Sequence, residues 1–216
     1  MIIQIPVQGF DNNFCYFVAD EKLDEIAVID PACVSHLEAE IRQSLLIPRM
    51  VLLTHSHFDH TEGVPEMIEK YGVPVYIHKN ARGRLDVLET YIVEIEDGDK
   101  IKIGDVEILV MHTPGHIDDA VCYYISAEQD PNGVPKLFSG DTVFVEGCGR
   151  ADLEYSNVKD LYESLQRIKA LPDETEVYPG HDYGTRPFSN IGYEKKYNRF
   201  FKCDNFEEFK KMRLPS

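Results

Sequence analysis

The sequence predicts a single α/β domain spanning residues 1–216, in which sheets pack face to face and helices cover them. Three observations support this fold class. The chain has 216 residues, of which 43% are hydrophobic and 28% charged, as is ordinary for one sizeable globular domain. Strand-like segments gather in two groups, and each group is followed by helical segments. No linker-like composition, internal repeat or low-complexity tract separates the two groups.

The first group begins at the N-terminus, where short apolar runs alternate with turn-forming residues. The expected strands lie at 2–7, 14–19, 25–30, 50–53 and 73–78. Helices are expected at 32–45, 64–71 and, in a short form, 79–88. The helix at 32–45 follows from Leu37, Ile41 and Leu45, which recur every four residues, and the one at 64–71 ends at Tyr71-Gly72.

The second group repeats this order. Strand-like runs occur at 91–95, 101–103, 105–111, 120–125, 136–139 and 175–178. A longer helix is predicted at 156–170, where Val158, Leu161, Leu165 and Ile168 share one face. The tail from Ile191 is also predicted to be helical.

Charge and cysteine content narrow the class of protein. The formal net charge of -16 repels phosphate backbones, so nucleic acid is not an expected partner. No apolar run is long enough to span a bilayer and the N-terminus lacks signal-peptide features, so we expect a cytoplasmic protein without a membrane partner. Five widely spaced cysteines with no C-x-x-C pair fit reduced thiols. We expect a small-molecule substrate, and the sequence allows a homodimer.

Histidines and aspartates gather at the ends of predicted strands. The stretch "THSHFDH" at 54–60 follows the strand at 50–53 and holds His55, His57, Asp59 and His60. Three further residues, each after a different strand, complete the set: His116 in "HTPGH", Asp141 in "FSGDT" and His181 in "YPGHDY". Loops held at strand ends by a rigid scaffold are where binding chemistry collects.

The spacing within the heptad predicts metal binding. In an extended segment His55 and His57 project to the same side and can reach one ion. Asp59 and His60 open the following helix and can point to a second position nearby. Imidazole and carboxylate suit Zn, Fe or Mn.

The other histidines lack this context. We expect His36 to face solvent on its helix and His78 to be a surface residue at a strand end. His112 could support a ligand from behind. Cys148 is expected to be a buried structural thiol, since no cation or helix start is evident to activate it.

These motifs together resemble the metallo-β-lactamase superfamily. "LTHSHFDHTEG" resembles its H-x-H-x-D-H signature, and "HTPGH", "LFSGDTVFVEGCGR" and "VYPGHDY" follow in the family's order over nearly the whole chain. The resemblance implies an αββα four-layer sandwich with the site at one edge of the sheets. It also implies that His55, His57 and His116 hold one metal ion and that Asp59, His60 and His181 hold a second, with Asp141 bridging the two.

The stretch "SGDTVFVEGCGRADL" resembles two branches of the superfamily. One is glyoxalase II, which implies a hydrolase of hydroxyacylglutathione-like thioesters with two divalent ions, Zn above Fe or Mn. Hydroxide bound to the metal would attack the carbonyl, with Asp59 steering it and accepting a proton. Arg150 in "GCGR" would receive a substrate carboxylate.

The other branch is the persulfide dioxygenases, which implies a single Fe(II) held by His55, His116 and Asp141 and acting on glutathione persulfide. Asp141 is essential under either reading. A non-catalytic metal-binding protein is a remote alternative, because losing catalysis would remove the need for a full ligand set. Only 35 residues (216 − 181) follow His181, less than the glutathione-binding domain of full-length glyoxalase II needs, so the thiol carrier stays open.

Overall fold

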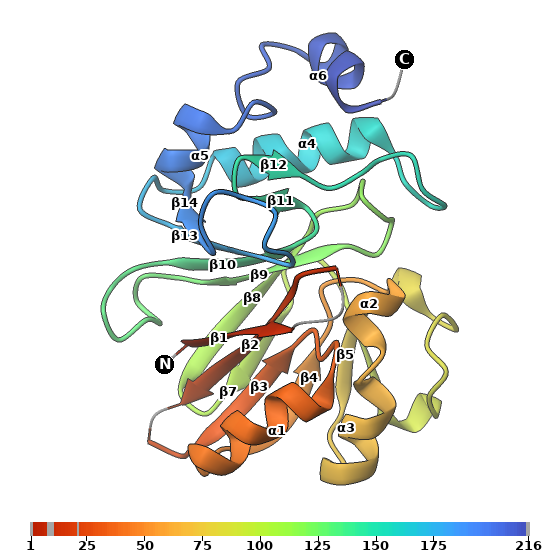
Figure 1. Ribbon diagram of the computed structural model, residues 1–216, viewed down its shortest axis with the longest axis vertical. Coiled ribbons are helices and arrows are strands. Elements are labelled where there is room, and N and C mark those ends of the chain that lie inside the picture. Colours follow the sequence, from red (N-terminus) through yellow and green to blue (C-terminus); the bar gives the residue numbers. More distant parts are fainter. Residues whose placement is uncertain (1, 8–10, 21, 215–216) are drawn as a thin grey trace.

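The computed structural model describes residues 2–7, 11–20 and 22–214, which form two six-stranded sheets stacked face to face with helices outside them (Figure 1). The first sheet has the order β1-β2-β3-β4-β5-β6 and the second β14-β13-β10-β9-β8-β7. Helices α1 and α3 cover the first sheet, and α4 to α6 lie over the second. The predicted αββα sandwich is therefore confirmed.

The first half contains the following elements: β1 (Ile2–Val7), β2 (Asn13–Asp20), β3 (Glu25–Ile29), α1 (Val34–Gln43), β4 (Ile47–Leu52), α2 (Phe58–Thr61), α3 (Val64–Tyr71), β5 (Val75–His78), η1 (Lys79–Ala81), η2 (Glu89–Tyr91) and β6 (Ile92–Ile95). Strands β3 to β6 run parallel, whereas β1, β2 and β3 pair antiparallel. The helix predicted at 64–71 agrees with α3, which ends where Gly72 adopts a left-handed backbone at φ 63°.

The second half comprises β7 (Lys100–Ile103), β8 (Val106–His112), β9 (Val121–Ile125), β10 (Lys136–Gly140), β11 (Val143–Phe144), β12 (Gly147–Cys148), α4 (Val158–Lys169), β13 (Glu176–Pro179), β14 (Ser189–Asn190), α5 (Ile191–Tyr197) and α6 (Phe206–Arg213). Strand β10 pairs parallel with β13 and antiparallel with β9. Asn157 begins α4 by accepting hydrogen bonds from the backbone N–H groups of Lys159 and Asp160.

Three apolar clusters hold the layers together, as a four-layer sandwich requires. One lies between the sheets and includes Tyr16, Tyr123 and Phe138. A second packs the first sheet against α1 and α3, and a third packs the second sheet against α4 and α6. Because alternate residues of inner strands such as β2 enter different clusters, these strands are apolar on both faces and fix the position of each sheet on its neighbours.

One predicted helix is wrong. Residues 79–88 form only the short 3₁₀ turn η1, after which Arg82 is extended and Gly83 takes a φ of 75°. A left-handed glycine cannot continue a right-handed helix, so the segment becomes a loop.

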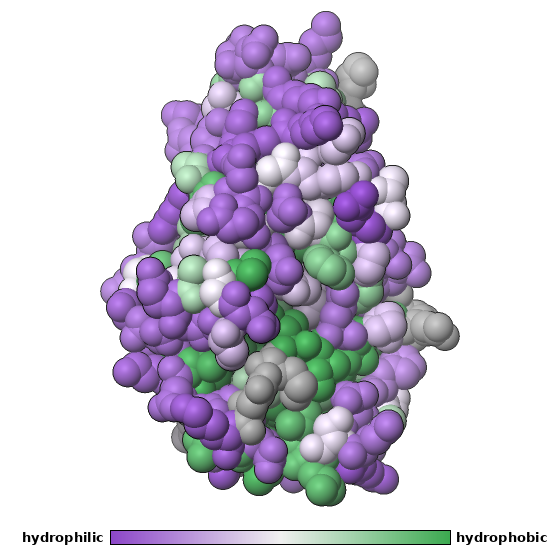
Figure 2. Space-filling view, turned by 90° about the vertical axis from the view of Figure 1, so that its left-hand side faces the viewer, coloured by the Kyte–Doolittle hydropathy of each residue, from purple (hydrophilic) through white to green (hydrophobic). Residues whose placement is uncertain are grey.

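The face of the molecule seen in Figure 2 has a hydrophilic and a more apolar part. In the side view the upper half, over α4 to α6, is mainly hydrophilic, and apolar groups gather in the lower half (Figure 2). Within the described residues no helix is both long and apolar enough to cross a membrane.

Candidate metal centre

The seven histidines and aspartates singled out from the sequence converge at one edge of the sandwich. They follow the carboxyl ends of β4, β8, β10 and β13, which come from both sheets. Their ligand atoms form three overlapping groups, in each of which the atoms lie within 4.8 Å of one another. Five of the seven side chains are buried, and His57 and Asp59 are partly exposed.

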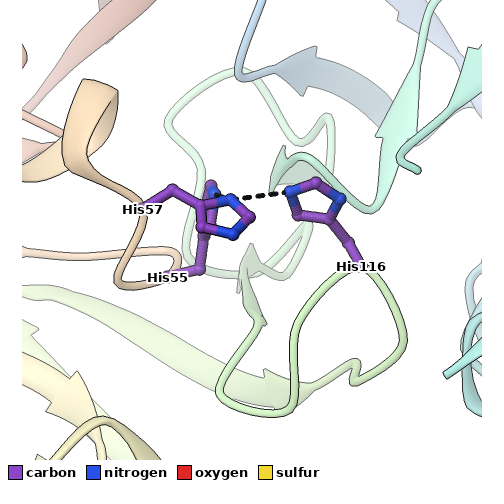
Figure 3. A group of neighbouring side chains, drawn as sticks. All are labelled: His55, His57 and His116. Atoms are coloured by element: carbon purple, nitrogen blue, oxygen red, sulfur yellow. Dashed lines mark hydrogen bonds between the residues drawn. The ribbon is translucent and has the colours of Figure 1, made fainter. Parts of the chain in front are cut away.

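The first group consists of His55, His57 and His116, whose rings face one another in Figure 3. The Nδ1 atom of His57 lies 3.0 Å from His55 Nε2 and 2.9 Å from His116 Nε2. His55 leaves β4 in an extended segment, and His57 directly precedes α2 with a ψ of 144°. The backbone stays extended from one to the other, so both imidazoles point to the same place, as predicted.

The second group consists of Asp59, His60 and His181. The Nε2 atoms of His60 and His181 are 3.2 Å apart, and Asp59 Oδ2 lies 3.4 Å from each of them. Helix α2 begins after His57, so Asp59 and His60 project from its first turn beside His181, while the His60 ring still lies 4.2 Å from that of His55.

Asp141 lies between the two groups. Its Oδ2 atom is 3.5 Å from His116 Nε2, whereas its Oδ1 atom is 3.4 Å from His60 Nε2 and 3.2 Å from His181 Nε2. One carboxylate oxygen therefore faces each group.

Acceptors behind the imidazoles determine which nitrogen carries the proton. His116 Nδ1 lies 3.0 Å from the carbonyl oxygen of Arg150, and His181 Nδ1 lies 2.8 Å from that of Asp11. His60 Nδ1 lies 2.9 Å from Asp30 Oδ2. A carbonyl or carboxylate oxygen can only accept, so each Nδ1 donates to it. The Nε2 atoms of these three rings are then left with lone pairs that point into the centre.

This donor set fits divalent metal ions. The Nε2 lone pairs of His60 and His181 face each other at 3.2 Å and repel unless a cation lies between them. Tetrahedral ligands at roughly 2.0 Å from one ion are about 3.3 Å apart, close to this separation. The buried Oδ1 atom of Asp141 also makes no well-aligned hydrogen bond. Imidazole and carboxylate together suit Zn, Fe or Mn.

The charges of the two groups differ. Burial lowers the pKa of His55 well below its usual value, and burial lowers that of His57 to about 4. Burial also opposes a charge on His60, but the carboxylates Asp141 and Asp30 outweigh it and raise the pKa of His60 well above its usual value. The carboxylates around the second group therefore stabilise positive charge there. A bound metal ion would supply this charge in place of protons on the histidines.

Two supporting residues were missed in the sequence. Asp30, at the end of β3, accepts hydrogen bonds from the backbone N–H of Thr54 and from its hydroxyl, in addition to that from His60. Asn13 Nδ2 donates to Asp59 Oδ2 at 3.0 Å. Asp30 and Asn13 both lie far from the heptad in the sequence, at no spacing that is typical of metal ligands. The only sequence signal for Asp30 is a carboxylate at the end of an apolar strand.

Glycines give the centre its close packing. A Cβ atom at Gly180 would lie 2.4 Å from Asp141 Oδ1 and 2.9 Å from His60. One at Gly149 would lie 2.0 Å from the backbone oxygen of Asp141 and 2.9 Å from His116 Nδ1. "GCGR" and "YPGHDY" therefore need glycine because backbone passes directly behind the candidate ligands.

A cavity of about 310 Å³ opens onto the centre. Besides the candidate ligands, its wall includes Phe144, Leu153, Tyr183 and Arg150. Tyr183 stacks on His181 at an interplanar angle of 6°. The side chain of Arg150 is exposed and pairs with Asp152 at 2.9 Å, while its carbonyl supports His116. Arg150 thus lies where a substrate-binding residue was expected.

The remaining histidine and cysteine predictions have mixed outcomes. His36 is exposed, as predicted. The prediction for His78 is wrong: it is buried and stacks on His112, with ring centroids 3.9 Å apart. The ring of His112 also contacts the carbonyl of Asp118 and no candidate ligand. Cys148 is buried, as predicted, and burial raises the pKa of its thiol to about 12.

Fold and donor set define an αββα enzyme with a histidine–aspartate metal centre. The chain belongs to the metallo-beta-lactamase superfamily, to which residues 8–181 match.

Two curated relatives are similar over most of the chain. The probable polyketide biosynthesis zinc-dependent hydrolase PksB of Bacillus subtilis is 31% identical, over 98% of this chain and 91% of PksB. The hydroxyacylglutathione hydrolase of Hahella chejuensis is 32% identical over 83% of this chain, but the match spans only 65% of that longer enzyme.

Solved structures agree. ETHE1 from Myxococcus xanthus superposes with a TM-score of 0.84 at 30% identity, over 100% of this chain and 92% of that one. A di-iron-bound form of TTHA1623 gives a TM-score of 0.75 at 30% identity, over 92% and 99% of the two chains. These similarities agree with the two neighbouring branches, glyoxalase II and the persulfide dioxygenases, that the sequence motifs resemble.

Proposed function

We propose that this protein is a metal-dependent hydrolase of thioesters with a two-ion centre. His55, His57 and His116 would hold one ion, and Asp59, His60 and His181 would hold the other. Asp141 would bridge the two. Zn is the expected metal, with Fe or Mn as alternatives, since the donor set accommodates all three.

The observation that carries this proposal is the completeness of the second group. A single-ion centre needs only His55, His116 and Asp141, and Asp59, His60 and His181 would then have no task. Instead, their donor atoms lie within 4.8 Å of one another, and each histidine is held by an acceptor at its Nδ1 atom. The zinc-dependent and glutathione thioester hydrolases among the relatives support the same class.

Ions bound at the two positions would lower the pKa of water and polarise a carbonyl group, which is the chemistry that hydrolysis needs. Asp59 is a partly exposed candidate ligand that lines the cavity, so its carboxylate can accept a proton from the attacking water. Asn13 donates to Asp59 Oδ2 and thereby orients the carboxylate. Phe144 and Leu153 line the cavity and would exclude bulk water from the acyl group. Thiolates leave readily, so no general acid is required.

A second candidate function is an iron dioxygenase acting on glutathione persulfide. It is favoured by the structural similarity to ETHE1 and by the His55, His116 and Asp141 face, which offers two histidines and one carboxylate to one ion. In this case Arg150 would again serve the substrate rather than the metal.

Metal content and turnover together decide between the two. The protein is purified without added metal, its metals are counted, and it is assayed for hydrolysis of S-lactoylglutathione and other thioesters and for oxygen uptake with glutathione persulfide. About two ions per chain with hydrolysis and no oxygen uptake is the expected result. About one iron per chain with oxygen uptake and no hydrolysis would overturn the proposal.

A further inference from the structure

Asp119 is a buried carboxylate that the proposed hydrolysis does not use. It lies in the connection between β8 and β9, three residues after His116, and its side chain is 0% exposed. Both of its oxygen atoms are buried without a well-aligned hydrogen bond. Among residues 2–7, 11–20 and 22–214 it is the one carboxylate for which this holds at both oxygens. Burying an unsatisfied carboxylate is costly, so its presence needs an explanation.

A hydrogen bond between the two sheets brings Asp119 close to the heptad. The backbone N–H of Val121, at the start of β9, donates to the carbonyl of Thr54 at 2.8 Å. Asp119 lies two residues before Val121, and Ser56 lies two residues after Thr54. The two segments therefore pass each other with the Ser56 hydroxyl beside the Asp119 carboxylate, and the two groups interact.

Two side-chain donors face this carboxylate. Arg84 Nη1 lies 3.5 Å from Asp119 Oδ1, but the same guanidinium makes shorter hydrogen bonds, of 2.6 and 3.0 Å, to the neighbouring Asp118. Burial raises the pKa of Asp119 to about 6, although the Ser56 hydroxyl and Arg84 favour the charged form. Because Arg84 is engaged by Asp118, the Ser56 hydroxyl is the side-chain donor that remains for Asp119.

His57 is the candidate ligand that depends most on its backbone for support. A side chain or a backbone carbonyl lies behind each of the other four candidate histidines, at Nδ1. The outer ring nitrogen of His57, Nε2, has no hydrogen-bond partner in the described part of the chain. On one side of His57, helix α2 fixes its carbonyl, which accepts from Thr61 Oγ1 at 3.2 Å and from the backbone N–H of His60 at 3.0 Å. On the other side lies Ser56, so a contact that holds Ser56 also sets the direction of the His57 ring.

We propose that Asp119 is a positioning residue for the first metal position. Its carboxylate holds the Ser56 hydroxyl and thereby fixes the segment from His55 to His57. The inference rests on the metal position of the proposed function, formed by His55, His57 and His116, but not on the thioester reaction. A carboxylate that is kept at a cost to folding and serves metal binding gives these two properties opposite responses to its removal.

Asp119→Asn separates this role from a purely structural one. It removes a buried charge with little change of shape, and Arg84 keeps its hydrogen bonds to Asp118. The melting temperature of the metal-free protein should therefore stay the same or rise. The affinity for one metal ion should nevertheless fall by about tenfold to a hundredfold, as is usual for residues that orient metal-binding histidines.

Zinc titration of the metal-free protein, in competition with a chromophoric chelator, measures the dissociation constants, and calorimetric melting measures the stability. Full zinc affinity in Asp119→Asn would overturn the proposal. So would parallel losses of stability and affinity, because they would show that Asp119 only holds the fold together.

Ser56→Ala tests the route from Asp119 to the ligands. This variant should lower the zinc affinity by a similar factor, and Ser56→Ala/Asp119→Asn should bind zinc no more weakly than either single variant, because both act through one contact. An unaffected Ser56→Ala, or additive losses in the double variant, would overturn the proposal.

The matched control is Asp118→Asn, which removes the neighbouring carboxylate and leaves the one that faces Ser56. Its dissociation constants should stay within about threefold of those of the unmodified protein, because Asp118 is partly exposed and pairs with Arg84 alone. A loss as large as that of Asp119→Asn would mean that the charge of the whole connection, rather than the contact to Ser56, supports the metal position, and would overturn the proposal.

Two comparisons keep this proposal separate from the proposed function. In Asp59→Asn, which lacks a candidate ligand of the second group, the remaining ion should again be weakened by Asp119→Asn, and equal affinity with and without Asp119 would overturn the positioning role. Zinc affinity that depends on Asp119, in a protein that hydrolyses no thioester, would keep the positioning role and overturn the proposed function. Thioester hydrolysis with two ions whose affinities Asp119→Asn leaves unchanged would keep the proposed function and overturn the positioning role.

Discussion

The two halves of the sandwich build the candidate centre in different ways. The first half contributes four candidate ligands from one heptad, and side chains contact three of them from behind: Asp30 holds His60, Asn13 holds Asp59, and the Thr54 hydroxyl lies 3.1 Å from His55 Nδ1. The second half contributes one ligand from each of three loops, and backbone carbonyls support both of its histidines. Side-chain supports can be removed by substitution, whereas carbonyl supports cannot. Metal binding by the first half should therefore be the more sensitive to substitution of the residues that hydrogen-bond to the candidate ligands.

The largest effect should come from the residue that joins the halves. Asp141→Ala removes the one carboxylate that faces both groups, and metal stabilisation of several kcal/mol corresponds to a loss in kcat/KM of about a thousandfold or more. Kinetics and metal analysis check this, with the exposed Asp204→Ala as control. Turnover close to the unmodified level would show that Asp141 does not bridge.

Asp59→Asn tests what the first half of the sandwich contributes to metal binding and to proton transfer. The amide preserves shape but removes a ligand charge and the proton acceptor, so hydrolysis should fall by about a hundredfold or more and metal content should approach one ion per chain. Metal analysis and kcat distinguish the roles. An unchanged, iron-dependent oxygen uptake in this variant would favour the dioxygenase.

Asp30→Asn tests the side-chain support directly. Weakening the acceptor behind His60 should lower metal affinity or activity by about tenfold to a hundredfold, as is usual for residues that orient metal-binding histidines. Metal titration of the purified variant measures it. Full affinity would mean that the packing of His60, rather than its hydrogen bond, sets its orientation.

The smallest effect on activity is expected from a substitution of Arg150, because it is the backbone carbonyl of this residue that holds His116. Arg150→Gln keeps the carbonyl that holds His116, so the metal content should stay the same. KM for an acidic thioester should rise about threefold to tenfold, because only an exposed charge near the substrate is lost. Loss of metal from this variant would contradict the division between side-chain and backbone supports.

The same contrast explains how far sequence reasoning reached. The four candidate ligands of the heptad could be predicted because they are neighbours in the chain. His116, Asp141 and His181 could be predicted because each follows an apolar run that forms a strand. Asp30 and Asn13 were missed because their roles depend on which strands lie side by side. His78 was misplaced for the same reason: its burial comes from His112, which reaches it from the other sheet.

Two further segments were not predicted from the sequence. The loop after η1 has helical composition, but Gly83 ends the helix, and the hairpin β11–β12 was too short to predict from apolar pattern. Val143 and Cys148 of the hairpin are buried in the core, whereas the loop after η1 lines a cavity. Regions where packing does not decide the backbone are those where turn residues do.

Asp30 has a left-handed backbone, with a φ of 50°, although it is not a glycine. Such a conformation costs of order 1–3 kcal/mol and persists only where the surroundings impose it. The hydrogen bonds of its carboxylate to Thr54 and His60 supply that constraint. Part of the folding free energy is thus stored as strain directly behind a candidate ligand. The consequence is that His60 is already fixed in its orientation before an ion binds. Little reorganisation of this side chain then opposes binding.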